Sequence, residues 1–92
     1  STWRDWLTRE LTALGLKVTP SQANFILIRF PESADGNRLA EAAIAFLLRH
    51  GYILRWLPKQ GLGDCLRLTI GLEEDNRAVV SLLKDFLSGA RS

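Results

Sequence analysis

The sequence predicts an α+β domain in which a three- to four-stranded, mostly antiparallel sheet carries helices on one face. Stretches with apolar residues at every third or fourth position alternate with short runs rich in β-branched and aromatic residues. Glycines follow two of the helical stretches, at Gly15 and Gly51, where they can end a helix by taking a positive φ. At 92 residues and 47% hydrophobic content, the chain suits one compact domain over residues 1–92.

The first third of the chain predicts a helix followed by two extended segments. A helix is expected over Thr2–Leu14, with an apolar stripe formed by Trp3, Trp6, Leu7, Leu11 and Leu14. Leu16–Val18 begins an extended segment, and Thr19–Gln22 predicts a turn because it combines a proline with small polar residues. Asn24–Phe30 predicts a central strand with both faces largely covered.

The middle of the chain predicts a loop, a helix and a strand. Pro31–Asn37 is expected to be a loop whose Asp35 caps the next helix. That helix is expected over Asn37–Arg49, and the residues on its inward face are expected to be Leu39, Ala43, Phe46 and Leu47. After Gly51, Tyr52–Trp56 predicts a strand.

The last third predicts a loop, a strand and a helix. Leu57–Asp64 is expected to be a loop, and Cys65–Gly71 a strand whose Leu66, Leu68 and Ile70 face inward. The final helix is expected over Glu73–Leu87, with fraying from Ser88 to Ser92 and an inward face of Val79, Val80, Leu83, Phe86 and Leu87. We expect the strand of Arg67 to lie between the two strands that flank the middle helix, a split βαβ arrangement.

Composition excludes several function classes. The net charge of +2 comes from scattered basic residues, unlike the clustered charge of a nucleic-acid binder, and Trp3 and Trp6 fit helix packing better than base stacking. The longest apolar run, Ala40–Leu48, is too short to span a membrane. A single cysteine, Cys65, cannot form an internal disulfide and is expected to be a buried, inert thiol, which indicates a reducing compartment, the cytoplasm.

The sequence predicts no catalytic residue, cofactor-binding residue or metal ligand within this chain. His50 has no neighbouring serine, cysteine or aspartate that would complete a nucleophile-and-base arrangement. One histidine and one cysteine do not make a metal-ligand set. The glycines of "GLGD" precede a strand instead of opening a helix, so they do not form a phosphate loop.

Two arginines inside apolar strands, Arg55 and Arg67, are the candidate site residues. From the residues alone, two interpretations stay open. In one, Arg67 and Thr69 belong to the wet face of an antiparallel sheet and simply meet water. In the other, both arginines emerge on the same uncovered face and form a clamp that binds a carboxylate or phosphate bidentately.

Three segments carry a resemblance to a known family: "LTALGLKVTPSQANFILIRF" (Leu11–Phe30), "LLRHGYILRWLPKQGLGDCLRLTIG" (Leu47–Gly71) and "EEDNRAVVSLLKDFL" (Glu73–Leu87). At these separations, the patterns S-x-A-N-F, G-[YI]-x-[VL]-R and L-R-[IL]-T-I-G followed by E-x-N are fairly specific. The chain resembles the C-terminal small domain of the fold-type I aminotransferases that depend on pyridoxal phosphate, and within them the histidinol-phosphate aminotransferases most closely. Gly63 and Leu72 depart from the family pattern, which has a proline and a capping Thr or Ser there.

The resemblance implies a function for both arginines. Arg67 matches the arginine that binds the substrate carboxylate and can also meet a phosphate, and Arg55 matches a second arginine of the same anion site. Asn24 matches a motif that helps shape the domain. The implied reaction moves an amino group between L-histidinol phosphate and 2-oxoglutarate in a homodimeric enzyme.

The resemblance also implies that pyridoxal phosphate is held by a large domain that this sequence lacks, because Lys17, Lys59 and Lys84 do not match the imine lysine. The 92-residue chain alone is therefore expected to be inactive. Two alternatives remain: a threonine-phosphate decarboxylase of cobalamin synthesis, and a non-enzymatic, free-standing α+β module that binds an anion or another chain.

Overall fold

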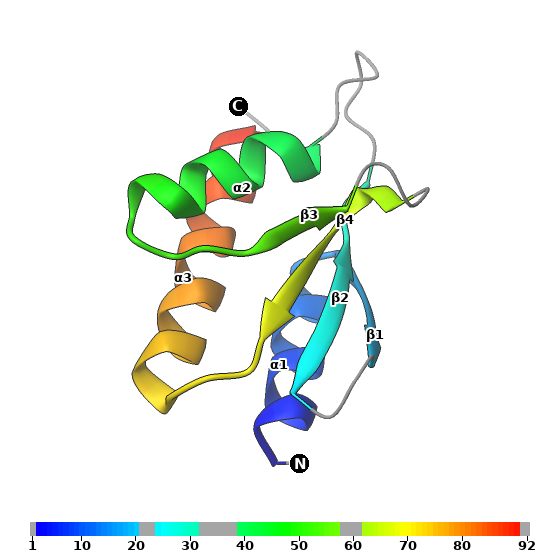
Figure 1. The fold of residues 1–92 in the computed structure, drawn as a ribbon, viewed down its shortest axis with the longest axis vertical. Helices are drawn as coiled ribbons and strands as arrows, with labels where there is room; N and C mark the ends of the chain where they lie inside the picture. Colours follow the sequence, from blue (N-terminus) through cyan, green and yellow to red (C-terminus); the bar gives the residue numbers. More distant parts are fainter. Residues whose placement is uncertain (1, 21–23, 32–38, 58–61, 91–92) are drawn as a thin grey trace.

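The computed structural model describes residues 2–20, 24–31, 39–57 and 62–90. These residues form three helices and four strands in the predicted α+β class (Figure 1). The elements follow one another as α1 (Thr2–Ala13), β1 (Lys17–Pro20), β2 (Phe25–Arg29), α2 (Leu39–Arg49), β3 (Arg55–Leu57), β4 (Leu62–Thr69) and α3 (Glu73–Ala90). None of these helices is both long and apolar enough to cross a membrane.

The sheet has the strand order β1-β2-β4-β3, and every neighbouring pair is antiparallel. The strand that carries Arg67 therefore lies between β2 and β3, as the sequence predicts. Since β2 and β3 are both antiparallel to β4, they run parallel to each other, and α2 connects them. This is the expected split arrangement.

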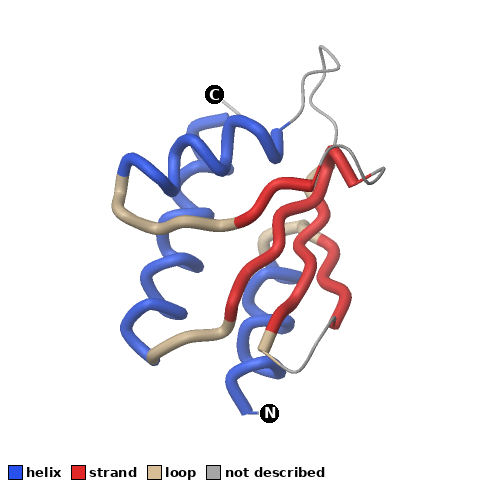
Figure 2. The backbone as a smooth tube through the Cα atoms, in the orientation of Figure 1, coloured by secondary structure: helices blue, strands red, loops and turns tan. Residues whose placement is uncertain are grey.

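The hydrophobic core lies on one face of the sheet. Ile26 and Ile28 of β2 and Leu66 of β4 are fully buried there. All three helices pack against this face (Figure 2), and they contribute to the core Leu7, Leu11, Ala40, Ala43, Leu47, Val79, Leu83 and Leu87. On the opposite face, which we call the outer face, Phe25 and Leu27 are half-buried and Arg29 is exposed. The prediction that both faces of β2 are largely covered therefore holds at Phe25 and Leu27 of the outer face and is wrong at Arg29.

Both predicted glycine stops are confirmed. Gly15 and Gly51 have φ of 91° and 88°, and each follows the last turn of a helix. At the end of α1, the N–H of Leu16 donates to the carbonyl of Leu11 (3.2 Å). At the end of α2, the N–H of Tyr52 donates to the carbonyl of Leu47 (2.9 Å). These bonds satisfy carbonyls that the helix itself leaves unpaired.

Two strand boundaries differ from the predictions for physical reasons. Thr19 and Pro20 belong to β1 and not to a turn; a proline is tolerated there because β1 is an edge strand. Strand β3 starts only at Arg55, because the backbone of Tyr52 is already engaged in ending α2.

The loop after β3 and the end of the chain were also predicted with the wrong boundaries. Strand β4 starts at Leu62, so the predicted loop Leu57–Asp64 is too long: Leu57 lies in β3 and pairs with Leu62. Helix α3 continues through Ser88 to Ala90, where fraying was expected, since Leu87 in its last turns is buried. Asp35 and its loop lie outside the described residues.

Candidate anion-binding site

Strand alternation directs Arg67 away from the core. Leu66 and Leu68, its neighbours on β4, are buried against the helices, so the side chain of Arg67 projects from the outer face. Arg55 on β3 lies directly opposite Arg67 in the antiparallel register. Directly opposed residues of an antiparallel pair point to the same face, so the two arginines stand side by side on the outer face.

Arg55 and Arg67 line one pocket of about 530 Å³. Its remaining walls are Ile44, Ile53, Leu54, Trp56 and Thr69. Ile53 is 85% exposed, so one side of the pocket is an apolar rim open to solvent. The pocket thus combines two guanidinium groups with a mainly apolar wall, which suits a ligand with an anionic end and a less polar body.

Neither Arg55 nor Arg67 forms an ion pair with any residue that the structure describes. In contrast, Arg29 pairs with Asp64 (2.6 Å) and Arg77 pairs with Glu73 (3.0 Å). Like charges directly opposite one another destabilise a sheet. An anion bound between the two guanidinium groups would turn this repulsion into attraction and could accept hydrogen bonds from both.

A third arginine on the outer face, Arg29, is already neutralised. It lies opposite Cys65 in the register and donates a hydrogen bond to Asp64 Oδ2 at 2.6 Å. This bond raises the pKa of Arg29 above its ordinary value. Burial by itself raises the pKa of Asp64, but the hydrogen bond from Arg29 and further favourable contacts outweigh it, so that pKa lies below its ordinary 3.8.

Cys65 is buried, as predicted, with 1% of its surface exposed. Burial is the main cause that raises the pKa of its thiol, and the nearby carboxylate of Asp64 raises it further. The Sγ atom donates to Asp64 Oδ1 at 3.6 Å. The thiol therefore stays protonated at neutral pH, which is not the state of a nucleophile.

Among the described residues, the side chain of Arg67 contacts the ring of Phe25. The guanidinium carbon lies over that ring, 4.4 Å from its centroid. The sequence predicts Phe25 only as part of a strand. Its contact with Arg67 could not be predicted, because the contact depends on the register between β2 and β4.

The other sequence candidates lie away from the arginine pocket. His50 is exposed after the end of α2, with its ring 4.8 Å from that of Phe46. Trp3 and Trp6 are half-buried and meet edge to face at 5.2 Å, and Arg77 of α3 lies over both rings. Trp6 also packs against the core, which confirms its packing role. Across the described ranges, no group of three or more His, Cys, Asp or Glu side chains is placed to hold a metal ion.

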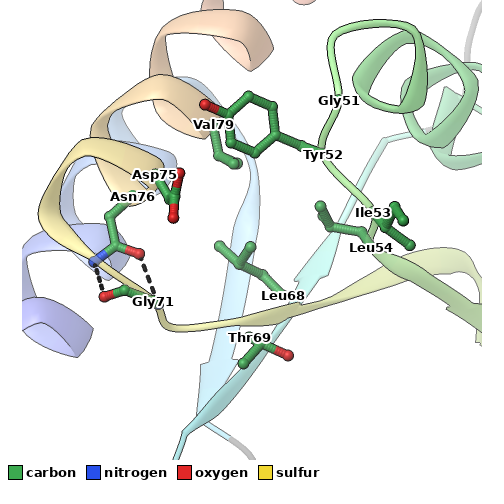
Figure 3. A pocket seen from close by; sticks show the side chains of 10 residues that line it. All are labelled: Gly51, Tyr52, Ile53, Leu54, Leu68, Thr69, Gly71, Asp75, Asn76 and Val79. Carbon is green, nitrogen blue, oxygen red and sulfur yellow. Dashed lines mark hydrogen bonds between the residues drawn. The ribbon is translucent and has the colours of Figure 1, made fainter.

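A second, smaller pocket of about 290 Å³ shares Ile53, Leu54 and Thr69 with the first. Figure 3 shows the residues that line it. This second pocket lies between residues 51–54, the end of β4 and the first two turns of α3. Within its wall, the side chain of Asn76 forms hydrogen bonds with both backbone groups of Gly71. The E-x-N pattern pointed to this asparagine without indicating its role.

Comparisons with known proteins agree on one family. The family model "Aminotransferase class I and II" matches residues 2–83. The histidinol-phosphate aminotransferase of Nitrobacter winogradskyi is 56% identical over 86 residues, and that of Rhodopseudomonas palustris is 52% identical over 87 residues. These alignments cover 94% and 95% of this chain, but 23% of each relative.

Solved structures share the fold. A Burkholderia pseudomallei protein described as an aminotransferase superposes with a TM-score of 0.74 at 31% sequence identity, and a decarboxylase from Sulfurospirillum multivorans with a TM-score of 0.77 at 26%. Each superposition covers 94% of this chain and 24% of the other protein. This chain thus spans about a quarter of the length of the proteins it matches. Because the family model matches most of its residues, the chain belongs to the class I and II aminotransferase family.

Proposed function

We propose that this chain is the C-terminal small domain of an aminotransferase that depends on pyridoxal phosphate. The complete enzyme converts L-histidinol phosphate and 2-oxoglutarate to imidazole acetol phosphate and glutamate, a step of histidine biosynthesis. The relatives named histidinol-phosphate aminotransferase, at 52% and 56% identity, support this substrate. We further propose that the enzyme is a cytoplasmic homodimer.

The observation that carries the proposal is the direct opposition of Arg55 and Arg67 on the outer face, within one pocket and without an acidic partner among the described residues. Guanidinium groups bind carboxylate and phosphate oxygens through paired, charge-assisted hydrogen bonds. In this role the two arginines bind the anionic group of the substrate and orient it, and the apolar rim at Ile53 helps to exclude water.

The described residues fit substrate binding and not attachment of the cofactor. Pyridoxal phosphate, when bound, supplies an electron sink for the amino-acid carbon. A lysine must hold it, yet Lys17 on β1 and Lys84 on α3 are exposed and line no part of the arginine pocket. We therefore expect the cofactor to be bound by a large domain outside this chain, and the isolated chain to be inactive.

A second candidate activity is a threonine-phosphate decarboxylase. The structural similarity to the decarboxylase from Sulfurospirillum multivorans favours keeping it. It too would use the two arginines for a phosphorylated substrate. A free-standing anion-binding module, the third candidate, would bind phosphate without any turnover.

Assays of the full-length protein with pyridoxal phosphate separate these candidates. We expect glutamate to form from L-histidinol phosphate and 2-oxoglutarate, with no carbon dioxide released from threonine phosphate. Carbon dioxide from threonine phosphate without glutamate formation would instead establish the decarboxylase. Phosphate binding without either product would establish the module.

A further inference from the structure

Phe25 is a large aromatic residue that takes no part in the hydrophobic core. It is the first residue of β2 and lies on the outer face, half-buried, directly opposite Thr69 of β4. The core cluster and the hydrophobic side chains packed against it do not include Phe25. The need to fill the core therefore does not explain an aromatic ring at this position.

The ring of Phe25 instead supports Arg67. The guanidinium carbon of Arg67 lies 4.4 Å from the ring centroid. This is closer than the contacts of Arg77 with the rings of Trp6 and Trp3, at 5.2 and 5.4 Å, and of Arg49 with Phe46, at 5.8 Å. A guanidinium over an aromatic face is attracted by the negative charge of the ring face, and partial burial strengthens the attraction. Arg67 is half-buried.

The two neighbours of Arg67 act on it from opposite sides. Arg55 lies on β3, on one side of β4, and repels the guanidinium of Arg67; Phe25 lies on β2, on the other side, and attracts it. Both effects hold the guanidinium of Arg67 on the β2 side of β4, while its side chain still lines the pocket that Arg55 also lines. Phe25 does not line the arginine pocket, so its ring supports Arg67 without occupying the space where an anion binds.

From this arrangement we propose that Phe25 is a positioning residue, which holds the guanidinium of Arg67 in the orientation that binds the substrate anion together with Arg55. The proposal rests on the proposed function of the two arginines. It adds a residue that does not touch the substrate and acts on binding only through Arg67.

The test compares two substitutions in the full-length enzyme. Phe25→Leu keeps an apolar side chain but removes the ring, and Phe25→Tyr keeps the ring. We expect Phe25→Leu to raise KM for L-histidinol phosphate about three- to tenfold, in line with the loss of a partly buried cation–π contact, while kcat changes less than about twofold. Phe25→Tyr should restore KM to within about twofold of the unsubstituted enzyme. An unchanged KM in Phe25→Leu, or an equal defect in both variants, would overturn the proposal.

A double-mutant cycle separates positioning from a general structural role. In an Arg67→Ala background, Phe25→Leu should change KM less than about twofold, because the group that the ring positions is gone. A further three- to tenfold loss in that background would contradict the proposal. Trp3→Leu is the matched control: it removes a ring beneath Arg77, on the far side of the core, and should leave KM unchanged.

Stability and substrate identity need separate controls. If Phe25→Leu does not fold, Phe25→Met replaces it, and failure of both to fold would overturn the proposal because the ring would then serve the fold. If the unsubstituted enzyme does not turn over L-histidinol phosphate, the proposed function fails, and the same variants are titrated calorimetrically with inorganic phosphate. If only Phe25→Leu binds phosphate more weakly, the positioning role of Phe25 is still supported. Equal binding by all variants, or no phosphate binding by the unsubstituted protein, would overturn the proposal.

Discussion

The side-chain amide of Asn76 hydrogen-bonds both backbone groups of Gly71: Oδ1 accepts from the Gly71 N–H at 3.0 Å, and Nδ2 donates to the Gly71 carbonyl at 3.1 Å. Asn76 is 2% exposed, so these bonds satisfy a side-chain amide that lies away from water. They join the first turn of α3 to the end of β4. This link fixes the start of α3, where Leu72 has no side-chain oxygen with which to cap the helix.

Replacing Asn76 with alanine should lower the free energy of unfolding by about 2 kcal/mol, because the N–H and carbonyl of Gly71 both lose a buried partner. Urea denaturation followed by tryptophan fluorescence measures the change. Ser81→Ala, at an exposed position of the same helix, is the control and should stay within about 0.5 kcal/mol of the unsubstituted chain. Equal stability of the Asn76 variant and this control would contradict the role given to the amide.

Gly51→Ala and Gly89→Ala should change stability in opposite directions. A Cβ at either position meets no atom within 4 Å, so only the backbone conformation differs. Gly51 has a φ of +88°, where an alanine costs about 1–2 kcal/mol. Gly89 lies within α3, where alanine should stabilise the chain by about 0.5–1 kcal/mol. The change in the midpoint of thermal unfolding measures both effects. A rise in both variants, or a fall in both, would be incompatible with these backbone conformations.

The Arg29–Asp64 ion pair should make stability depend on acid pH. The folded state holds the pKa of Asp64 below its ordinary 3.8. The ion pair therefore stabilises the fold fully at pH values above 3.8, and this contribution is lost as the pH falls through the lowered pKa of the folded state. Asp64→Asn should therefore be less stable than the unsubstituted chain at pH 7, with a difference that vanishes in strong acid. Since both side chains are substantially exposed, added salt should also shrink the difference. A difference that persists unchanged at low pH would show that the carboxylate charge is not responsible.

Much of the fold follows from local patterns in the sequence. The alternation around Arg67 predicted which side chains of β4 face the core, and the glycines at 15 and 51 predicted both helix ends. These features depend on neighbours within a few residues of each other. The interior positions of α3 were predicted for the same reason.

The features that sequence reasoning missed depend on register and on competition between elements. The start of β3 could not be read from its β-branched and aromatic run, because ending α2 uses the backbone of Tyr52. The opposition of Arg55 and Arg67 was a hypothesis until the register was known, since a one-residue shift would send one of them to the core face. The support of Arg67 by Phe25 depends on the same kind of pairing between β2 and β4.

Binding of the substrate anion by Arg55 and Arg67 is tested most directly by replacing each outer-face arginine with alanine in the full-length enzyme. The quantity to measure is kcat/KM for L-histidinol phosphate. Arg67→Ala should lose about 2–3 kcal/mol or more of transition-state stabilisation, a fall of at least about 30-fold, and Arg55→Ala should also be impaired. Arg29→Ala, which removes an arginine already paired with Asp64, should stay within about threefold of the unsubstituted enzyme. An unchanged kcat/KM in Arg67→Ala, or an equal fall in Arg29→Ala, would contradict the assignment of Arg55 and Arg67 as the anion-binding pair.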